Sequence, residues 1–311
     1  MHTLVTGNTG FIGMQLCKEL IKKGFKVTAL SRNQENFKLE SFSKDVDTKN
    51  LHLVNCDILN ETELHETFKK IEPVDCIFRL AGQTYRKDLS NPQIYFQNNF
   101  IGTLNILETC RIFDVKKLVF SSSIAVYGLS VNQFTPQYLP VDEKHPVRPY
   151  DFYDASKSHA EELCHFYQMR YGIESAALRY SRVYGPTMGK GLIFQAIKKA
   201  ISDEPIEVLG DISTDFVFVD DVLQANISSM RKKFLKMEIF NIGSGEERSL
   251  HWICSTIVDL CHSSSKIIFH EKPKSKFSLD VSKAGKLLGY NPTKTKKGLI
   301  ECINYIKNSI I

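Results

Sequence analysis

The sequence has no apolar run near the ~20 residues that a bilayer-spanning helix needs. No signal-peptide arrangement precedes the first predicted strand, so we expect a cytoplasmic protein without a membrane anchor. The eight cysteines are scattered, with neither a Cys-x-x-Cys pair nor the histidine spacing of a metal site. We therefore expect reduced thiols in the core and no bound metal.

Concentrated charge is also missing. The net charge is +5, and the lysines are spread along the chain, with the densest run at residues 294–297. That run is typical of a solvated loop, and no nucleic-acid-binding motif accompanies it. The charge balance suits an acidic, phosphate-bearing small molecule, and we expect neither nucleic acid nor a membrane as a partner.

Strand and helix patterns alternate through most of the chain. Apolar strand candidates recur at residues 74–80, 118–121, 174–179 and 238–242, with helical patterns between them. Such alternation predicts an α/β fold with a parallel sheet. The 311 residues exceed an ordinary nucleotide-binding domain, so we expect a main body fused to a smaller lobe.

A glycine-rich turn follows the first strand candidate, residues 2–6. It runs Gly7-Asn8-Thr9-Gly10-Phe11-Ile12-Gly13 and leads into a helical pattern. In such turns the first glycine allows the tight bend, the second lets a pyrophosphate approach the backbone, and the third permits close helix–strand packing. The helix N-terminus then faces the anion. This turn, with Phe11 and Ile12, predicts a dinucleotide site on a Rossmann-type, doubly wound sheet.

The end of the second strand indicates which dinucleotide is bound. Residues 26–30 are followed by Ser31 and Arg32, with no carboxylate for a ribose 2′-hydroxyl. An arginine at this place suits the 2′-phosphate of NADP, so NADP is favoured while NAD stays possible. The alternative is that Arg32 is a solvated loop residue.

Another carboxylate follows the third strand, residues 51–55. Asp57 and Ile58 stand where an adenine ring would be held, and Asp57 could bond its amino group. The same carboxylate could instead cap the next helix, which is predicted to begin near Asn60. The sequence leaves both interpretations open.

Three side chains form a candidate proton-transfer device. Ser123 follows the apolar strand at residues 117–120, and Tyr153 and Lys157 are four residues apart in a helical pattern. A tyrosine, with an ordinary pKa near ~10, acts as a base at neutral pH only if a nearby cation stabilises its phenolate. Lys157 supplies that charge, and Ser123 would donate a hydrogen bond to the reacting oxygen.

These motifs resemble those of the extended short-chain dehydrogenase/reductases, the NAD(P)-dependent epimerase/dehydratase family acting on nucleotide sugars. Nearly the whole chain is covered, in order, by the glycine turn, Leu80-Ala81-Gly82, and residues 98–103, 121–128, 153–157, 183–186 and 215–222. The resemblance implies that Ser123 polarises the reacting oxygen and Tyr153 moves its proton. Lys157 would bind the nicotinamide ribose and lower the pKa of the tyrosine.

The resemblance has further implications for the cofactor site and the domains. Leu80, Ala81 and Gly82 would line the cofactor, and Asn99 would brace the helix or a water near the site. The dinucleotide-binding domain would comprise residues 1–180 with return segments near 210–242, and the substrate-binding lobe residues 181–209 and 243–311. Many relatives dimerise through paired helices, which residues 96–113 and 153–171 would supply, so a homodimer is expected.

The segment after Ser123 narrows the reaction. Dehydratases and decarboxylating relatives carry acidic residues there, whereas this chain has Ile124 and Ala125. The segment is most similar to that of 4-epimerases, which remove a hydride to form a keto sugar and return it to the opposite face. Arg32 favours instead an NADPH-dependent keto-sugar reductase. A non-catalytic dinucleotide sensor is a third hypothesis, which the presence of all three device residues argues against.

Substrate-binding positions depart from the family's pattern. Arg182 stands where relatives often have an asparagine, and Thr214 where many have an arginine that holds the substrate diphosphate. The loop at 210–213 looks shortened, and residues 272–276 also lack the usual arginine. These departures indicate either a different grip on the substrate diphosphate, for which Arg179, Arg182 and Arg248 are the candidates, or a substrate that is not a nucleotide sugar. Arg182 could equally be a solvated or packing arginine.

Overall fold

The computed structural model describes residues 1–37, 39–43, 46–84, 91–128, 136–208, 212–270 and 276–310. They belong to two compact units. The first unit comprises Met1–Gly128, Val147–Arg179 and Leu223–Phe240, and the second comprises Leu129–Pro146, Tyr180–Val222 and Asn241–Ile311. Residues 136–146 pack with the second unit, a grouping that the sequence did not indicate.

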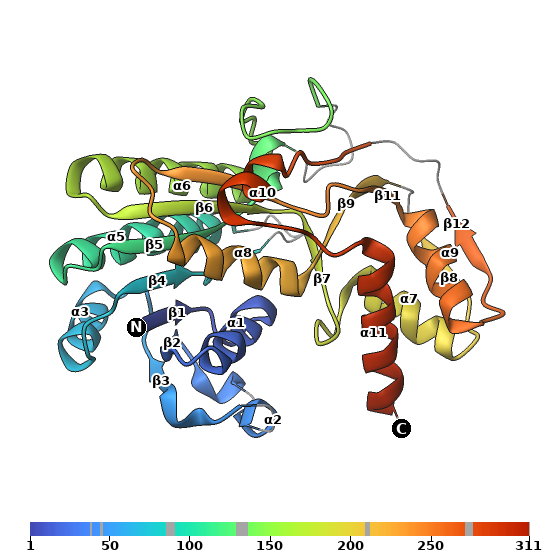
Figure 1. The fold of residues 1–311 in the computed structure, drawn as a ribbon, viewed down its shortest axis with the longest axis horizontal. Coiled ribbons are helices and arrows are strands. Elements are labelled where there is room, and N and C mark those ends of the chain that lie inside the picture. Colours follow the sequence, from blue (N-terminus) through green and yellow to red (C-terminus); the bar gives the residue numbers. More distant parts are fainter. Residues whose placement is uncertain are drawn as a thin grey trace. The chain divides into compact units, whose positions relative to one another are not determined.

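A seven-stranded sheet forms the centre of the first unit (Figure 1). Its order is β10-β6-β5-β4-β1-β2-β3, and the pairs from β3 to β5 are parallel. The strands are β1 His2–Thr6, β2 Lys26–Ser31, β3 Leu51–Asn55, β4 Cys76–Arg79, β5 Lys117–Ser123, β6 Glu174–Tyr180 and β10 Glu238–Ile242. The direction of strand order reverses between β1 and β4, which is where such sheets bind ligands. The predicted α/β, doubly wound parallel sheet is confirmed.

Helices cover this sheet because its central strands are apolar on both faces. Every residue of β1 and of β4 is buried. The helices are α1 Phe11–Lys22, α2 Leu39–Ser43, α3 Glu61–Lys70, α4 Gln93–Tyr95, α5 Gly102–Ile112, α6 Phe152–Tyr171 and α8 Val219–Arg231. A π-helix at Phe96–Ile101 joins α4 to α5. Figure 1 shows α5 and α6 running along β5, over one apolar core cluster.

The start of α6 fixes the position of the predicted tyrosine and lysine. Asp151 precedes the helix, and its side chain accepts a hydrogen bond from the backbone N–H of Asp154, which is the usual N-cap arrangement. Gly172 ends the helix at a φ of 70°, a left-handed conformation that glycine adopts easily. Tyr153 and Lys157 consequently lie on the first two turns of α6, one above the other.

The described residues of the second unit form two small sheets and the helices that cover them. The strands are β7 Arg182–Tyr184, β8 Ile206–Val208, β9 Ser213–Phe218, β11 Glu247–Ser249 and β12 Ile267–Phe269, in the orders β11-β9-β7 and β12-β8. The helices are α7 Gly191–Ile201, α9 Leu250–Cys261, α10 Ser282–Leu288 and α11 Thr295–Ile310. The apolar faces of α7, α9 and α11 share one core cluster with β7, β8 and β9.

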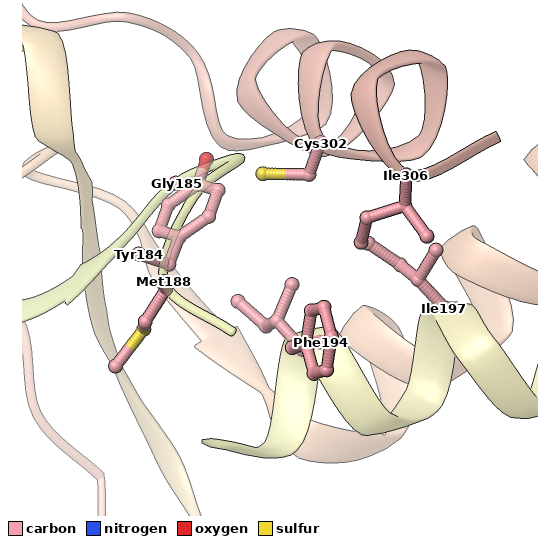
Figure 2. A pocket seen from close by; sticks show the side chains of 8 residues that line it. Tyr184, Gly185, Met188, Phe194, Ile197, Cys302 and Ile306 are labelled. Carbon is pink, nitrogen blue, oxygen red and sulfur yellow. The ribbon is translucent and has the colours of Figure 1, made fainter. Parts of the chain in front are cut away.

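A small apolar pocket opens inside this second core. Figure 2 shows Phe194 and Ile197 of α7 facing Cys302 and Ile306 of α11, with Tyr184 on the remaining side. The Tyr184 hydroxyl donates a hydrogen bond to the Thr295 carbonyl. The lining therefore offers no acid–base pair, and the predicted chemistry has to be sought in the first unit.

The described residues contain neither a candidate membrane span nor a candidate metal site. No described helix is both long and apolar enough to cross a bilayer. Within the same residues, no group of three or more histidine, cysteine or acidic side chains is placed to hold a metal ion. None of the eight cysteines forms a disulfide, and seven of them are buried.

Candidate active site

The glycine turn has the shape that a pyrophosphate needs. Gly7 has a φ of 77°, and a Cβ there would lie 2.7 Å from the backbone nitrogen of Ala81. A Cβ on Gly13 would lie 2.2 Å from the Gly7 carbonyl oxygen, so the start of α1 packs directly on the turn. The N-cap is Gly10, whose lack of a side chain leaves the first N–H groups of α1 accessible to an anion. The residues present thus fit a dinucleotide.

The side chain of Gln34 links the carboxyl ends of β2 and β3. Gln34 donates hydrogen bonds to the carbonyls of Ala29 and Val54, at 2.8 Å each, and accepts one from Asn8 of the glycine turn. Arg32, between β2 and this glutamine, is exposed. The structure therefore holds the strand ends rigidly beside the predicted ribose site and leaves the arginine at the surface.

The structure separates the two interpretations of Asp57. The N-cap of α3 is Asn60, whose side chain accepts from the backbone N–H of Glu63 at 3.1 Å. Asp57 makes a local turn instead, accepting from the N–H of Leu59 at 3.0 Å. Since Asp57 does not cap the helix, its predicted role beside the adenine remains a proposal, as does that of the buried Ile58.

Ser123, Tyr153 and Lys157 come together at the carboxyl end of β5. The hydroxyl of Ser123 lies near that of Tyr153 and lowers its pKa. Ser123 Oγ also accepts a hydrogen bond from the N–H of Ala125 at 3.2 Å. Lys157 is 6% exposed and donates to the Ser121 carbonyl at 2.8 Å. Its ammonium lies 5.1 Å from the centre of the Phe120 ring. This is the arrangement that proton transfer to or from a substrate hydroxyl needs.

Burial moves the pKa values of the pair in opposite directions. Desolvation raises the pKa of Tyr153 to about 12, although the Ser123 hydroxyl works the other way. Desolvation lowers the pKa of Lys157 to about 7; the positive charge of Arg79 lowers it further, and Glu161 raises it. The pKa of Lys157 thus lies close to neutral pH, whereas that of Tyr153 lies far above it. A further positive charge beside them lowers the pKa of Tyr153 and so favours the phenolate.

Asn99 connects the strand end to the catalytic helix. It is fully buried, accepts from the Gln83 N–H at 2.8 Å, and donates to the Gln83 carbonyl at 3.0 Å. It also donates to the hydroxyl of Ser156, the neighbour of Lys157, at 2.9 Å. A Cβ on Gly82 would lie 2.7 Å from Asn99 Oδ1, so the loop after β4 packs tightly on this amide. The predicted bracing of the helix agrees with this geometry.

Arg179 has a different setting from the one predicted. It is 2% exposed, and its guanidinium donates to both oxygens of Glu161, at 2.9 and 2.6 Å. The guanidinium carbon also lies 4.7 Å from the centre of the Tyr127 ring. Burial alone would lower the pKa of Arg179, but Glu161 raises it above the ordinary value. Nη1 has no hydrogen-bond partner among the described residues, but the guanidinium is buried and paired with Glu161, so the geometry does not support the predicted substrate contact.

Arg182 and Arg248 lie on one small sheet of the second unit. Arg248 of β11 is directly opposite Thr214 of β9, and Arg182 of β7 is opposite Phe216, two residues further along β9. Residues two apart on a strand share a face, so both arginines flank the position where the sequence lacks the expected one. The Arg182 residue as a whole is exposed to solvent. Even so, the protein around its guanidinium desolvates that group and lowers its pKa.

Arg248 has two partners within its unit. It forms an ion pair with Glu246 at 3.1 Å and lies 4.5 Å from the centre of the Trp252 ring. Two other segments named for substrate binding, residues 210–211 and 272–275, lie outside the described residues.

Sequence reasoning missed Arg79, Ser122 and Glu161 near the catalytic pair. Ser122 donates to Glu161 at 2.5 Å, which completes the buried network with Arg179. Arg79 ends the otherwise apolar strand β4 and is buried. A charged residue at the end of a buried strand was the signal for Arg79, whereas the three-way network depends on contacts between distant segments.

A dinucleotide-binding sheet with a serine, tyrosine and lysine at one strand end defines a short-chain dehydrogenase/reductase type of enzyme. The family model for the NAD dependent epimerase/dehydratase family matches residues 3–243, and the chain belongs to that family. The predicted family, its extended type and its enzymatic nature are confirmed.

Relatives and solved structures agree with this assignment. A putative UDP-glucose 4-epimerase of Methanocaldococcus jannaschii is 36% identical, over 98% of each chain. The UDP-glucose 4-epimerase structure from Thermotoga maritima, with UDP-glucose, has a TM-score of 0.86 at 26% identity and covers all of both chains. A UDP-glucuronic acid 4-epimerase from Bacillus cereus, with UDP-glucuronic acid and NAD, has a TM-score of 0.83 at 28% identity, covering 99% of this chain and 100% of that one. The predicted nucleotide-sugar epimerase activity is supported.

Proposed function

We propose that the protein is a UDP-sugar 4-epimerase. The observation that carries this proposal is the Ser123, Tyr153 and Lys157 cluster, followed by Ile124 and Ala125 in place of an acidic residue. Without a carboxylate at that point, elimination and decarboxylation lack their expected base. Oxidation and re-reduction of one sugar carbon then remain. The activities named for the relatives support carbon 4 as the reacting carbon and uridine diphosphate as the nucleotide part of the substrate.

The residues present can carry both halves of such a reaction. The bound nicotinamide would take up a hydride from carbon 4 and give it back. Tyr153 accepts the proton of the 4-hydroxyl, Ser123 donates a hydrogen bond to the developing carbonyl oxygen, and Lys157 holds positive charge beside the phenolate. For the return step the hydride goes back to the opposite face of carbon 4, and the same tyrosine gives its proton back to the oxygen on that carbon.

The direct test is conversion of UDP-sugars without added cofactor. The purified protein is incubated with UDP-glucose, UDP-galactose or UDP-glucuronic acid, and the products are resolved by chromatography and proton NMR. We expect inversion at carbon 4 for at least one of them, and its loss by a factor of about 10² or more in Tyr153→Phe, with cofactor binding intact. Tyr305→Phe, at an exposed position of α11, is the matched control. Undiminished turnover in Tyr153→Phe would remove that residue from the mechanism.

We further propose NADP as the dinucleotide. Support comes from the end of β2, where Ser31 and the exposed Arg32 stand in place of a carboxylate. The structure from B. cereus carries NAD, yet an epimerase returns the hydride it removes, so its reaction direction does not require either cofactor. We expect the protein to bind NADP more tightly than NAD, and Arg32→Ala to reduce that preference about tenfold or more. Retained NAD in the freshly purified protein would overturn this choice.

A reductase that consumes NADPH is the second candidate, because Arg32 fits it equally well. Its signature is stoichiometric loss of NADPH absorbance with a UDP-4-keto sugar, without inversion of any saturated sugar. An epimerase instead shows inversion with no net change in cofactor absorbance.

We also propose a homodimer in the cytoplasm. The first unit exposes large apolar side chains on and beside α5 and α6, namely Ile101, Ile112, Phe166, Met169 and Tyr171. Pairing of these helices with those of a second copy would bury them. We expect light scattering to give a dimer mass and Met169→Glu to give a monomer, while Leu235→Glu, also at an exposed position, leaves the mass unchanged.

A further inference from the structure

Arg79 is a buried cation that no carboxylate of the described residues pairs with. It ends strand β4, is 1% exposed, and has two nitrogens, Nε and Nη1, with no hydrogen-bond partner among the described residues. Its third nitrogen, Nη2, donates to the Asn98 carbonyl at 2.5 Å. Burying a guanidinium with so few partners is costly, so the position calls for an explanation beyond packing.

The strand register places Arg79 beside the catalytic lysine. Arg79 is opposite Phe120 in the parallel pair of β4 and β5, so both side chains project from the same face of the sheet. The Lys157 ammonium lies above the ring of that same Phe120. A Cβ on Gly102 would come within 3.0 Å of Arg79 Nη2, so the start of α5 leaves room for the guanidinium. Two cations therefore share one apolar space.

Arg79 also reaches the element that carries Asn99. Its Nη2 bond goes to the backbone of the π-helix Phe96–Ile101, at the residue before Asn99. Asn99 in turn bonds the loop after β4 and Ser156, next to Lys157. π-Helical turns are rare and occur often at functional sites. The guanidinium thus contacts the π-helix that supports α6, and it also lies close to the ammonium of Lys157.

We propose that Arg79 is a positioning residue for the Tyr153–Lys157 pair, supplying a second, uncompensated positive charge behind it and holding the π-helix that braces it. The inference rests on the proposed function, in which this pair moves the substrate proton. Removing the charge would make it harder to deprotonate both groups, because a positive neighbour disfavours the ammonium and favours the phenolate. The direction of the Lys157 pKa, to which Arg79 contributes, supports this account.

The other charged and titratable groups around the pair do not cancel Arg79. On α6, Glu161 acts on Lys157 but is bound to Arg179 of β6 and to Ser122 of β5. Asp151 and Asp154, at the start of α6, and Tyr95 of α4 act on Tyr153, and each raises its pKa. Cys164 of α6 is the group that acts on Arg79, and burial keeps it a neutral thiol by raising its pKa.

The test uses two replacements of Arg79 that separate charge from hydrogen bonding. Arg79→Gln keeps a donor and removes the charge, whereas Arg79→Lys keeps the charge. Tyr153 ionisation is followed by tyrosinate absorbance with the oxidised dinucleotide saturating, subtracting for each protein the same protein carrying Tyr153→Phe. We expect the ionisation step to move up by about one pH unit in Arg79→Gln and to stay near the wild-type value in Arg79→Lys. If Arg79→Gln does not fold, Arg79→Met takes its place.

The pH dependence of epimerisation gives a second readout. Both limbs of the profile should move to higher pH in Arg79→Gln, which a loss of packing alone would not produce. If Tyr153 ionises at the wild-type pH in the Arg79→Gln protein, the proposal is overturned. Arg79 would then only hold the π-helix in place through its hydrogen bond to Asn98. The absorbance titration needs no sugar, so a failure of the epimerase assay with a shifted titration would count against the proposed function only.

Discussion

Two buried arginines flank the catalytic helix α6, and they differ in their partners. Among the described residues, Arg179 in β6 donates two hydrogen bonds to Glu161 and leaves Nη1 without a partner, whereas Arg79 in β4 has one carbonyl contact and two unpartnered nitrogens. The first is a neutralised pair, and its charge is cancelled locally. The second keeps its charge and acts on Lys157. Equal burial therefore accompanies two different roles, one in holding the sheet to the helix and one in setting the electrostatics of the site.

The largest expected effect comes from breaking the paired arginine. Glu161→Ala leaves the Arg179 charge buried without its carboxylate, and we expect a loss of about 3–5 kcal/mol in the free energy of unfolding, measured by urea denaturation. The double variant Glu161→Ala/Arg179→Met should regain most of it, because no buried charge is then left alone. A Glu161→Ala protein as stable as wild type would show that the pair contributes nothing.

A third arginine extends the comparison to the second unit. Arg182 is exposed and lies beside the Thr214 position, so we expect Arg182→Ala to raise the KM for the UDP-sugar about 10- to 100-fold with little change in dinucleotide affinity. Arg231→Ala, in the last turn of α8, is the control. Equal losses in substrate and cofactor binding would contradict a specific substrate role.

The pH dependence of stability tests the lowered pKa of Lys157, to which the charge of Arg79 contributes. Its pKa of about 7 in the folded protein is below the value of ~10.4 for an unfolded lysine. Between pH 7 and 8 the unfolded chain therefore binds more protons at this residue, and stability should rise with pH by about 1 kcal/mol. Lys157→Met removes this contribution, so the difference between the two proteins in urea midpoints at the two pH values isolates it. A parallel response in both would argue against a lowered pKa.

The smallest effect is expected for Arg79 itself. Because its charge has no carboxylate to lose, Arg79→Met should change the free energy of unfolding by no more than about 1 kcal/mol. Urea denaturation beside Glu161→Ala measures the contrast directly. A loss as large as that of Glu161→Ala would mean that Arg79 is chiefly structural.

The sequence predicted the parts of the molecule that local rules determine. The glycine turn needs three glycines at fixed spacing, and Tyr153 and Lys157 need only one helical turn, so both could be placed without tertiary contacts. Arg179 shows the limit of this reasoning. The absence of the family's arginines elsewhere makes Arg179 a candidate for the substrate contact, but its partner Glu161 lies 18 residues away on another element. Only the packing of β6 against α6 reveals that the guanidinium is already occupied.

Arg248 shows a second limit. The missing arginine at Thr214 is visible in the sequence, but the candidate replacement is 34 residues further along. It becomes a neighbour only through the antiparallel register of β9 and β11, which no short-range pattern specifies. Asp57 was undecided for a related reason, since both it and Asn60 can cap a helix, and backbone geometry selects Asn60.

The π-helix at Phe96–Ile101 has a consequence for tracing the ancestry of this chain. A π-helical turn accommodates one more residue than an α-helical turn, so this segment can lose a single residue and become a regular α-helix. Such a deletion would rotate everything before it by about 100° and carry Asn99 away from Gln83 and Ser156. Among descendants of a common ancestor, a one-residue gap in this short segment would therefore mark a lineage in which the brace on α6 had been rebuilt.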